Sequence, residues 1–307
     1  MTRPYQEGDS VQAKWSKSSL VNVRGGTLTH KRMNTTWNAL ARVAKEGRWG
    51  KLAPHNLTEK QFRKYVEIRR DVDGIAAHCL AVETGHIRRA LRGCGREDFA
   101  AVVTNAMLGV PKGSRIGTGK ATEPEVLAAA RASAAPGVRA VIDLCNGIGL
   151  RIREAVCCAQ LLEIWRMEMD EGQPLSVEIE TKGNRPRCVF LRSEESRKLA
   201  SDAIGRTITH LKETGQKFLV ESTSEEGAIR AIERDFAELG LEADNSAHSL
   251  RRDFAVREYL YLREKGLTKR EACGKLSIAL GHGSSRHRWV WNNYLRATLE
   301  ALGRDGD

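Results

Sequence analysis

Four separated segments of the sequence carry polar side chains of the kinds that act on anions. They are Gly149-Leu150-Arg151-Ile152-Arg153-Glu154, Lys182, His248-Ser249-Leu250-Arg251, and Leu280-Gly281-His282 with Tyr294 twelve residues after the histidine. Arginine, lysine and histidine donate hydrogen bonds to anions, and a tyrosine hydroxyl is a nucleophile. Taken singly, each segment has an ordinary structural explanation: a surface ion pair, a solvated lysine, a helix cap or a core aromatic. The chemistry therefore depends on all four segments acting together.

Helices are expected to carry the first and third segments. Arg151 and Glu154 are three residues apart, so on a helix they share a face. His248 and Arg251 have the same spacing and open a helix that extends to about residue 264. Their side chains would project together beside backbone N–H groups, which also favour an anion.

A β-hairpin and a final helix are expected to carry the other residues. Polar and apolar side chains alternate over residues 176–180, and residues 187–191 are also strand-like. The turn sequence between these segments places Lys182 at the tip or shoulder of a β-hairpin. The last helix of the sequence contains Tyr294, which is the only tyrosine after His282.

In this order the segments resemble the motifs of the tyrosine recombinase family, the phage integrases. The ordered pattern is Gly-Leu-Arg-x-x-Glu, a hairpin lysine, His-x-Leu-Arg, Leu-Gly-His and a late tyrosine. Leu57-Thr58-Glu59-Lys60-Gln61 and His86-Ile87-Arg88-Arg89-Ala90-Leu91 also look like the helical domain that precedes the catalytic domain in that family, so the resemblance spans roughly residues 28–300. It implies a mainly α fold with a small β-hairpin (α+β). A SAM-like helical core-binding bundle would precede a mixed α/β catalytic domain.

The resemblance also implies the roles of the site residues. The catalytic set is Arg151, Lys182, His248, Arg251, His282 and the nucleophile Tyr294, with Glu154 in support. Attack on a phosphodiester develops charge on its non-bridging oxygens, which the two arginines would clamp, while the histidines would add hydrogen bonds and help to move the proton. A tyrosine hydroxyl has a pKa of about 10, so it needs this positive field. A lysine on a mobile hairpin suits the general acid that protonates the leaving 5′ hydroxyl.

The implied product is a 3′-phosphotyrosyl link and a free 5′ hydroxyl. Because that link keeps the bond energy, we expect neither ATP nor a metal ion, and no other cofactor. The glycine-rich residues 109–122 support the expectation that ATP is not used. A P-loop, which binds nucleotide phosphates, needs Gly where this sequence has Ser114 and Ser or Thr where it has Ala121. His282 and His287 could suggest a metal pair, but no third ligand is near in sequence.

Two features depart from the family pattern. A few extra residues lie between the Gly-His motif and the tyrosine, within residues 283–291, and Arg153 is an additional arginine between Arg151 and Glu154. Arg153 could therefore compete with Arg151 for a place on the phosphate. We prefer Arg151, because it follows Gly149-Leu150 as the motif does.

The formal net charge of +11 is concentrated in the first part of the chain. Residues 1–122 hold 22 Lys and Arg against 10 Asp and Glu, whereas residues 123–307 hold 28 against 29. A basic domain of this kind attracts polyanions, of which nucleic acid is the commonest. We expect it to grip the phosphate backbone without reading sequence, so that binding weakens steeply with salt.

Composition and periodicity divide the chain into four parts. Residues 1–27 are expected to be a polar, loosely ordered arm, residues 28–108 a helical core DNA-binding domain, residues 109–122 a flexible basic linker and residues 123–307 the catalytic recombinase domain. The residues predicted to contact DNA are Arg88 and Arg89 in the helical domain and Lys112, Arg115 and Lys120 in the linker.

The remaining composition predicts a globular protein of the cytoplasm. Seven cysteines occur without a Cys-x-x-Cys pair, which indicates free thiols in a reducing compartment. No stretch approaches about 18 consecutive apolar residues, and the polar N-terminal segment does not resemble a secretory signal. We therefore expect no contact with a membrane.

The leading interpretation is a site-specific DNA recombinase, or integrase, of a mobile element, acting on double-stranded DNA at attachment sites. The resemblance implies that four protomers assemble on two sites and exchange strands through a Holliday junction, with an accessory DNA-bending protein as a further partner. A type IB topoisomerase-like nicking and closing enzyme shares the chemistry, but the domain order favours the recombinase. A non-catalytic DNA-binding regulator on a recombinase scaffold is disfavoured, because decay would tolerate change at any of the motif positions.

Overall fold

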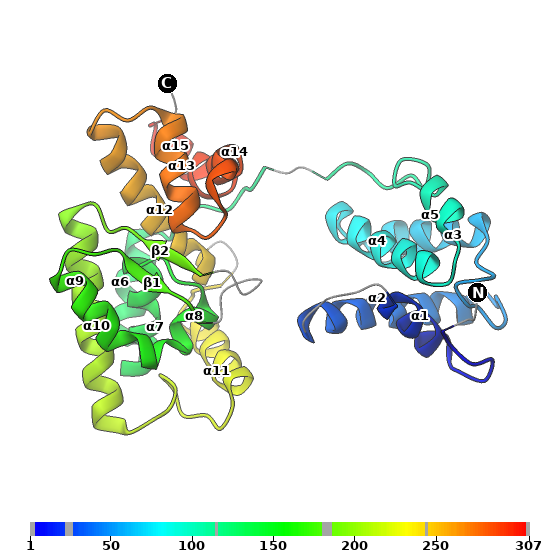
Figure 1. Ribbon diagram of the computed structural model, residues 1–307, viewed down its shortest axis with the longest axis horizontal. Coiled ribbons are helices and arrows are strands. Elements are labelled where there is room, and N and C mark those ends of the chain that lie inside the picture. The colour runs from blue at the N-terminus through cyan, green and yellow to red at the C-terminus, as the bar shows by residue number, and fades with distance from the viewer. Residues whose placement is uncertain (1–3, 22–26, 114–115, 180–185, 243–244, 305–307) are drawn as a thin grey trace. The chain divides into compact units, whose positions relative to one another are not determined.

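A computed structural model describes residues 4–21, 27–113, 116–179, 186–242 and 245–304 (Figure 1). The chain divides into two compact units, Met1–Ser114 (unit 1) and Arg115–Asp307 (unit 2). Helices make up most of both units, and the described strands form one two-stranded antiparallel sheet in unit 2. The mainly helical α+β fold predicted from the sequence is therefore confirmed.

Unit 1 is a set of short helices around an aromatic and aliphatic core. Its elements are α1 (Val11–Leu20), α2 (Thr27–Glu46), α3 (Glu59–Glu67), the π-helical turn η1 (Ile68–Val72), α4 (Ala77–Gly93) and α5 (Glu97–Val102). A capping box begins α3: the Thr58 hydroxyl accepts from the Gln61 backbone N–H, and the Gln61 side chain accepts from the Thr58 N–H.

The N-terminal segment is more ordered than a loose arm. Ser10 caps α1 by accepting a hydrogen bond from the Ala13 N–H at 3.2 Å, and Trp15 is fully buried in the core of unit 1. Helix α1 packs so closely on α4 that a Cβ at Gly93 would overlap the carbonyl oxygen of Ser18. The expectation of a loosely ordered arm is therefore wrong for α1, because burial of a large indole outweighs the polar composition around it.

Unit 2 is built around helix α7 (Pro136–Gly147), of which every residue from Gly137 except Arg139 is buried. Its other helices are α6 (Pro124–Ser133), α8 (Ile152–Val156), η2 (Cys158–Leu161), α9 (Leu162–Asp170), α10 (Glu194–Thr214), α11 (Glu225–Glu238), α12 (Ala247–Glu264) and α13 (Lys269–Ala279). Helices α8, α10, α11 and α12 all pack on α7. This largely buried helix therefore positions α8 and α12, two of the elements that carry predicted site residues.

The sheet of unit 2 consists of β1 (Leu175–Val177) and β2 (Arg187–Val189), with Ser176 opposite Cys188. Both strands are shorter than predicted, and the expected turn between them lies outside the described residues. Helix α9, which the sequence analysis did not predict, supports β1: Trp165 Nε1 donates to the Ser176 carbonyl oxygen at 2.6 Å.

The second half of the expected linker is bound to unit 2. The backbone N–H of Gly117 donates to the Asn292 carbonyl oxygen at 3.0 Å, and that of Ala121 to Thr298 Oγ1 at 2.8 Å. The Thr122 N–H donates to a carboxylate oxygen of Asp253 on α12 at 3.1 Å. The expectation of a flexible connector is therefore wrong for this part, because its backbone groups find partners along unit 2.

The last helix, which was predicted to contain Tyr294, is interrupted. The chain forms η4 (Ser284–Arg286), α14 (His287–Val290), the π-helical turn η5 (Trp291–Leu295) and α15 (Arg296–Ala301). Tyr294 lies in the π-helical turn and is buried. Turns of this kind are often found at functional sites.

None of the helices in the described ranges is both long and apolar enough to cross a membrane. All seven cysteines are free thiols, as predicted.

Candidate active site

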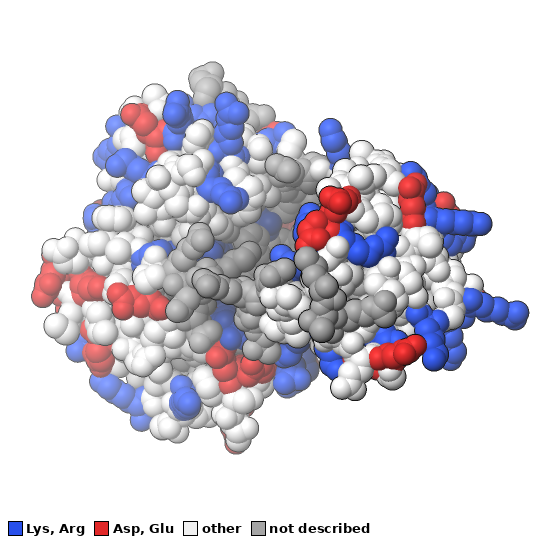
Figure 2. Space-filling model, turned by 45° about the vertical axis from the view of Figure 1, so that its right-hand side comes forward, with Lys and Arg blue, Asp and Glu red and all other residues white. Residues whose placement is uncertain are grey.

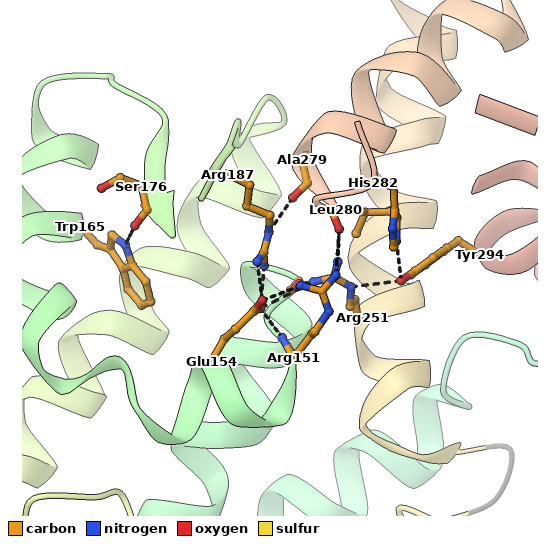
Figure 3. Close-up of polar contacts among 11 residues, drawn as sticks. Arg151, Glu154, Trp165, Ser176, Arg187, Arg251, Ala279, Leu280, His282 and Tyr294 are labelled. Atoms are coloured by element: carbon orange, nitrogen blue, oxygen red, sulfur yellow. Dashed lines mark hydrogen bonds and ion pairs between the residues drawn. The ribbon is translucent and has the colours of Figure 1, made fainter. Parts of the chain in front are cut away.

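Residues from five elements meet at one place in unit 2 (Figure 3). Arg151 lies at the start of α8, Arg187 at the start of β2 and Arg251 on α12, while His282 follows α13 and Tyr294 lies in η5. Hydrogen bonds connect these side chains to one another and to backbone carbonyl groups. The fold therefore brings together residues that are widely separated in the sequence.

Arg151 caps helix α8, and Glu154 binds it from the first turn. The Glu154 carboxylate accepts from the Arg151 backbone N–H at 2.8 Å and from its Nη1 at 2.5 Å. Arg151 Nη2 donates to the Leu280 carbonyl oxygen at 3.3 Å, and 25% of the side chain stays exposed. The two residues pair as predicted, but at a helix N-terminus rather than along a helix face, and the arginine remains open to a ligand.

Glu154 is buried and shared by several arginines. Its two oxygens accept from Arg187 Nη1 at 2.5 Å and Nη2 at 2.8 Å, and its Oε2 lies 3.9 Å from Arg251 Nη1. Burial disfavours the charged carboxylate, but the hydrogen bonds and charges of the surrounding arginines win and lower the pKa of Glu154 to about 2. An ionised Glu154 thus holds the arginines in place at neutral pH.

Arg251 is fully buried and joins three parts of the site. Its Nη1 donates to the Gly149 carbonyl oxygen, its Nη2 to that of Leu280 at 2.6 Å, and its Nε to the Tyr294 hydroxyl at 3.3 Å. Gly149 has a φ of 72°, and a Cβ there would overlap the ring of Phe254 on α12. The glycine of the Gly-Leu-Arg motif therefore allows the close approach that Arg251 needs.

The Tyr294 hydroxyl lies between Arg251 and two histidines. Its oxygen is 3.2 Å from His282 Nε2. The ring of His248 lies against the ring of Tyr294, with the centroids 5.0 Å apart. Arg251, His282 and His248 thus contact Tyr294, and Arg151 is joined to them through Glu154 and the Leu280 carbonyl group. Lys182 lies outside the described residues.

Trp289 forms one wall of the site and was not predicted to do so. Its ring meets the edge of His282 at a centroid distance of 4.3 Å and the ring of Tyr294 at 5.6 Å. Trp289 belongs to the extra residues between the Gly-His motif and the tyrosine. A tryptophan within that unusual insertion was the only signal in the sequence.

Of two further arginines, Arg153 lies outside the cluster and Arg187 lies within it. Arg153 points away from the cluster and forms an ion pair with Glu225 on α11, so it does not compete with Arg151. Arg187 lies inside the cluster, although no sequence motif singled it out. Its one signal was a basic residue at a strand position that pairs with the buried Val177.

The residues predicted to contact DNA differ in their surroundings. Arg89, Lys112 and Lys120 are exposed, whereas Arg115 lies outside the described residues. Arg88 is half-buried, and its Nη1 donates to the Val103 carbonyl oxygen at 3.1 Å and to Asn105 Oδ1 at 2.8 Å. Figure 2 shows more Lys and Arg than Asp and Glu on the displayed face of unit 1. The basic character predicted for this unit thus reaches its surface, but Arg88 has a partner inside it.

The described ranges contain no group of three or more His, Cys, Asp and Glu side chains placed to hold a metal ion.

Comparisons with known proteins match both the sequence and the fold. Residues 109–257 match the family model described as Integrase. A crystal structure of lambda integrase bound to DNA has a TM-score of 0.58 and 18% identity, covering 96% of this chain and 99% of that chain. The Tn1549 transposon integrase, in complex with transposon right end DNA, has a TM-score of 0.56 and 15% identity, covering 96% and 98%.

A third structure, a lambda integrase tetramer bound to a Holliday junction, has a TM-score of 0.55 and 17% identity, covering 91% of this chain and 79% of that chain. At these identities the likeness is one of fold. A comparison with curated protein sequences gives no significant match. The match of residues 109–257 to the Integrase family, the fold and the order of the sequence motifs agree with one another, and together they identify the tyrosine recombinases, the phage integrases, as the family that this chain resembles.

Proposed function

We propose that this protein is a site-specific DNA recombinase that cuts and rejoins double-stranded DNA through a covalent 3′-phosphotyrosine intermediate on Tyr294. The observation that carries the proposal is the position of the Tyr294 hydroxyl, 3.3 Å from Arg251 Nε and 3.2 Å from His282 Nε2. Both nitrogens belong to side chains suited to bind the oxygens of a phosphodiester.

The charges around the hydroxyl favour attack on phosphorus. One carboxylate, Glu154, is shared by Arg151, Arg187 and Arg251, which leaves a net excess of positive charge in this cluster. Such a field stabilises the tyrosinate that attacks and the charge that develops on the non-bridging oxygens. Arg151 and Arg251 are the clamp on those oxygens in this proposal.

The reaction conserves the number of phosphate ester bonds. The Tyr294 oxygen bonds to phosphorus as its proton leaves, and the bond from phosphorus to the 5′ oxygen breaks. Lys182 is proposed to protonate that 5′ oxygen, while His248 and His282 help to move the tyrosine proton. The phosphotyrosyl link keeps the energy for rejoining, so cleavage needs neither ATP nor a metal ion.

The side chains must rearrange when a phosphate enters. Only 1% of Arg251 and 2% of Tyr294 is exposed, so the tyrosine hydroxyl occupies a donor that the phosphate will use. The hydrogen bonds at this hydroxyl are long, at 3.2 and 3.3 Å, and such bonds cost little to exchange. The phosphate is expected to replace the hydroxyl at Arg251 and to place it in line for attack.

The proposed assembly uses both units and more than one copy of the chain. Unit 1 supplies exposed cations such as Arg89 and Lys112 for the DNA backbone. A tetramer on two attachment sites accounts for strand exchange, and an accessory DNA-bending protein would help to bring the sites together. The structure of a related protein, a lambda integrase tetramer bound to a Holliday junction, supports this arrangement.

A covalent capture experiment tests the proposal. The full-length protein is incubated with nicked, sheared genomic DNA from the source organism, and a denaturing wash leaves only covalent adducts for sequencing. The expected result is adducts at a small set of related sequences, none of which form with Tyr294→Phe. Adducts spread over all sequences, together with relaxation of any supercoiled plasmid, would indicate a topoisomerase. No adduct at all would contradict the proposal.

A further inference from the structure

Arg187 is a buried arginine at the start of β2 that no motif predicted. Only 2% of its side chain is exposed. A guanidinium is rarely buried unless it is paired, because removing its charge from water is costly. Burial and the charge of Arg251 lower the pKa of Arg187 to about 10, with Glu154 acting in the opposite direction, so the residue is still charged at neutral pH.

Every nitrogen of this guanidinium is bonded to the protein (Figure 3). Nη1 and Nη2 donate to the two oxygens of Glu154, and Nε donates to the Ala279 carbonyl oxygen at 2.9 Å. Arg187 thus joins β2 to α8 and to the end of α13. Because these contacts use all three nitrogens within the interior, Arg187 is not placed to bind substrate itself.

The pairing with Glu154 controls what that carboxylate does to Arg251. Glu154 Oε2 is 2.8 Å from Arg187 Nη2 but 3.9 Å from Arg251 Nη1. Without Arg187 the carboxylate would keep its 2.5 Å contact with Arg151 but lose its bidentate partner. Arg251, at 3.9 Å, is the next charge that could replace that partner. A direct pair between Glu154 and Arg251 would neutralise the arginine that donates to Tyr294.

The same side chain supports the turn that carries His282. A Cβ at Gly281 would lie 2.9 Å from Arg187 Cδ, and Gly281 has a φ of 68°. The turn therefore rests directly on the arginine stem, and only glycine fits there. This contact gives a physical reason for the glycine of the Leu-Gly-His motif.

We infer that Arg187 is a positioning residue for strand cleavage, which keeps Glu154 from neutralising Arg251 and holds the turn before His282. This inference rests on the proposed recombinase function. It assigns the buried β2 arginine to the cleavage step and not to the stability of the fold alone.

Single-turnover cleavage tests the inference, with the nicked duplex that the wild-type protein captures as substrate. Arg187→Met keeps most of the side-chain volume but removes the charge, and it should slow covalent capture by about 10- to 100-fold. The DNA dissociation constant should stay within about 3-fold, because Arg187 does not face a ligand. Arg187→Lys keeps the charge without the bidentate geometry, should show a smaller loss, and serves if Arg187→Met does not fold.

A second substitution separates positioning from a purely structural role. In Arg187→Met with Glu154→Gln the residue at 154 carries no charge to neutralise Arg251, so cleavage should recover by about 5-fold or more over Arg187→Met alone. Arg257→Met is the matched control, since Arg257 is a half-buried arginine that bonds to Ser196 and Asn146 away from the cluster. It should lower stability and leave the cleavage rate unchanged.

A crystal structure of Arg187→Met gives a readout that needs no DNA. The expected change is a hydrogen-bonded ion pair between Glu154 and Arg251, in place of the 3.9 Å ion pair without a hydrogen bond in the wild type. An unchanged distance, a double variant slower than Arg187→Met, or wild-type cleavage by Arg187→Met would each overturn the inference. Failure of the wild-type protein to form any adduct would instead count against the proposed function, and the crystal structure would still decide the role of Arg187.

Discussion

The hydroxyl of Tyr294 accepts a hydrogen bond from Nε of Arg251, a residue 43 positions earlier in the chain. Arg251 is held there by the carbonyl oxygens of Gly149 and Leu280. The Gly-Leu-Arg and Leu-Gly-His segments, which are far apart in the sequence, thus both bind Arg251, and Arg251 in turn binds Tyr294. The proposed chemistry depends on this arrangement.

Substitution of Arg251 should slow DNA cleavage far more than it weakens DNA binding. Arg251→Lys keeps a positive charge but cannot reach Gly149, Leu280 and Tyr294 at once, so we expect cleavage to fall by about 100- to 1,000-fold with little change in DNA affinity. Single-turnover covalent capture and gel-shift titration measure the two quantities. Arg263→Lys, near the far end of α12, is the control and should cleave at the wild-type rate. Equal losses in both variants would contradict this role.

Glu154 should stabilise the fold in a pH-dependent way. Folding lowers its pKa from 4.5 to about 2, so its contribution is complete above pH 4.5 and is lost as the pH falls toward 2. Glu154→Gln is therefore expected to lower the free energy of unfolding by about 3 kcal/mol at pH 7. Urea unfolding at a series of pH values should show this difference shrinking only below pH 4.5. A difference that is constant down to pH 2.5 would show that the charge of Glu154 is not its cause.

Substitution of Arg89 should weaken DNA binding, whereas substitution of the neighbouring Arg88 should lower the stability of the fold. Arg89 is exposed, so Arg89→Ala should weaken DNA binding and reduce the slope of log affinity against log salt by about 1, with stability unchanged. Arg88→Ala removes a donor from Val103 and Asn105 and should lower the free energy of unfolding by about 1–2 kcal/mol. Salt titrations of binding and thermal unfolding of both variants check this. The reverse assignment of the two effects would refute it.

The linker around Gly117, which is hydrogen-bonded to unit 2, should influence the rate at which Tyr294 cleaves DNA. A Cβ at Gly117 would lie 3.1 Å from Asn293, the residue before Tyr294, so Gly117→Ala must displace that backbone slightly. We expect cleavage to slow by about 3- to 10-fold, because small displacements of a reacting group are costly. Gly113→Ala is the matched control in the same segment, since its Cβ would make only ordinary 3.5 Å contacts with His78. If the two variants cleave equally fast, the linker does not influence Tyr294.

Short-range patterns in the sequence account for the starts of two helices. The capping boxes at Thr58 and Thr268 are present, because each needs only residues three positions apart. The motif residues also converge as expected, apart from Lys182, whose place stays a prediction. A capping box is a strong signal because it involves residues only three positions apart. The catalytic motifs are a strong signal only when all of them occur in the family's order.

What the sequence could not predict depends on long-range packing. Arg187 is buried because Glu154, 33 residues away, satisfies it; no local pattern carries that information. Trp15 makes α1 part of a core that only the folded unit 1 completes. The π-helical turn η5, which interrupts the last helix at Tyr294, likewise packs on α12, far away in the sequence.

The most direct test of the account is the chemical identity of the covalent adduct. The captured protein–DNA complex is digested with trypsin and nuclease, and the modified peptide is sequenced by mass spectrometry. The account predicts a nucleotide attached through its 3′ phosphate to Tyr294, within the peptide Trp-Val-Trp-Asn-Asn-Tyr-Leu-Arg of residues 289–296. An adduct on another residue, or a link through a 5′ phosphate, would contradict it.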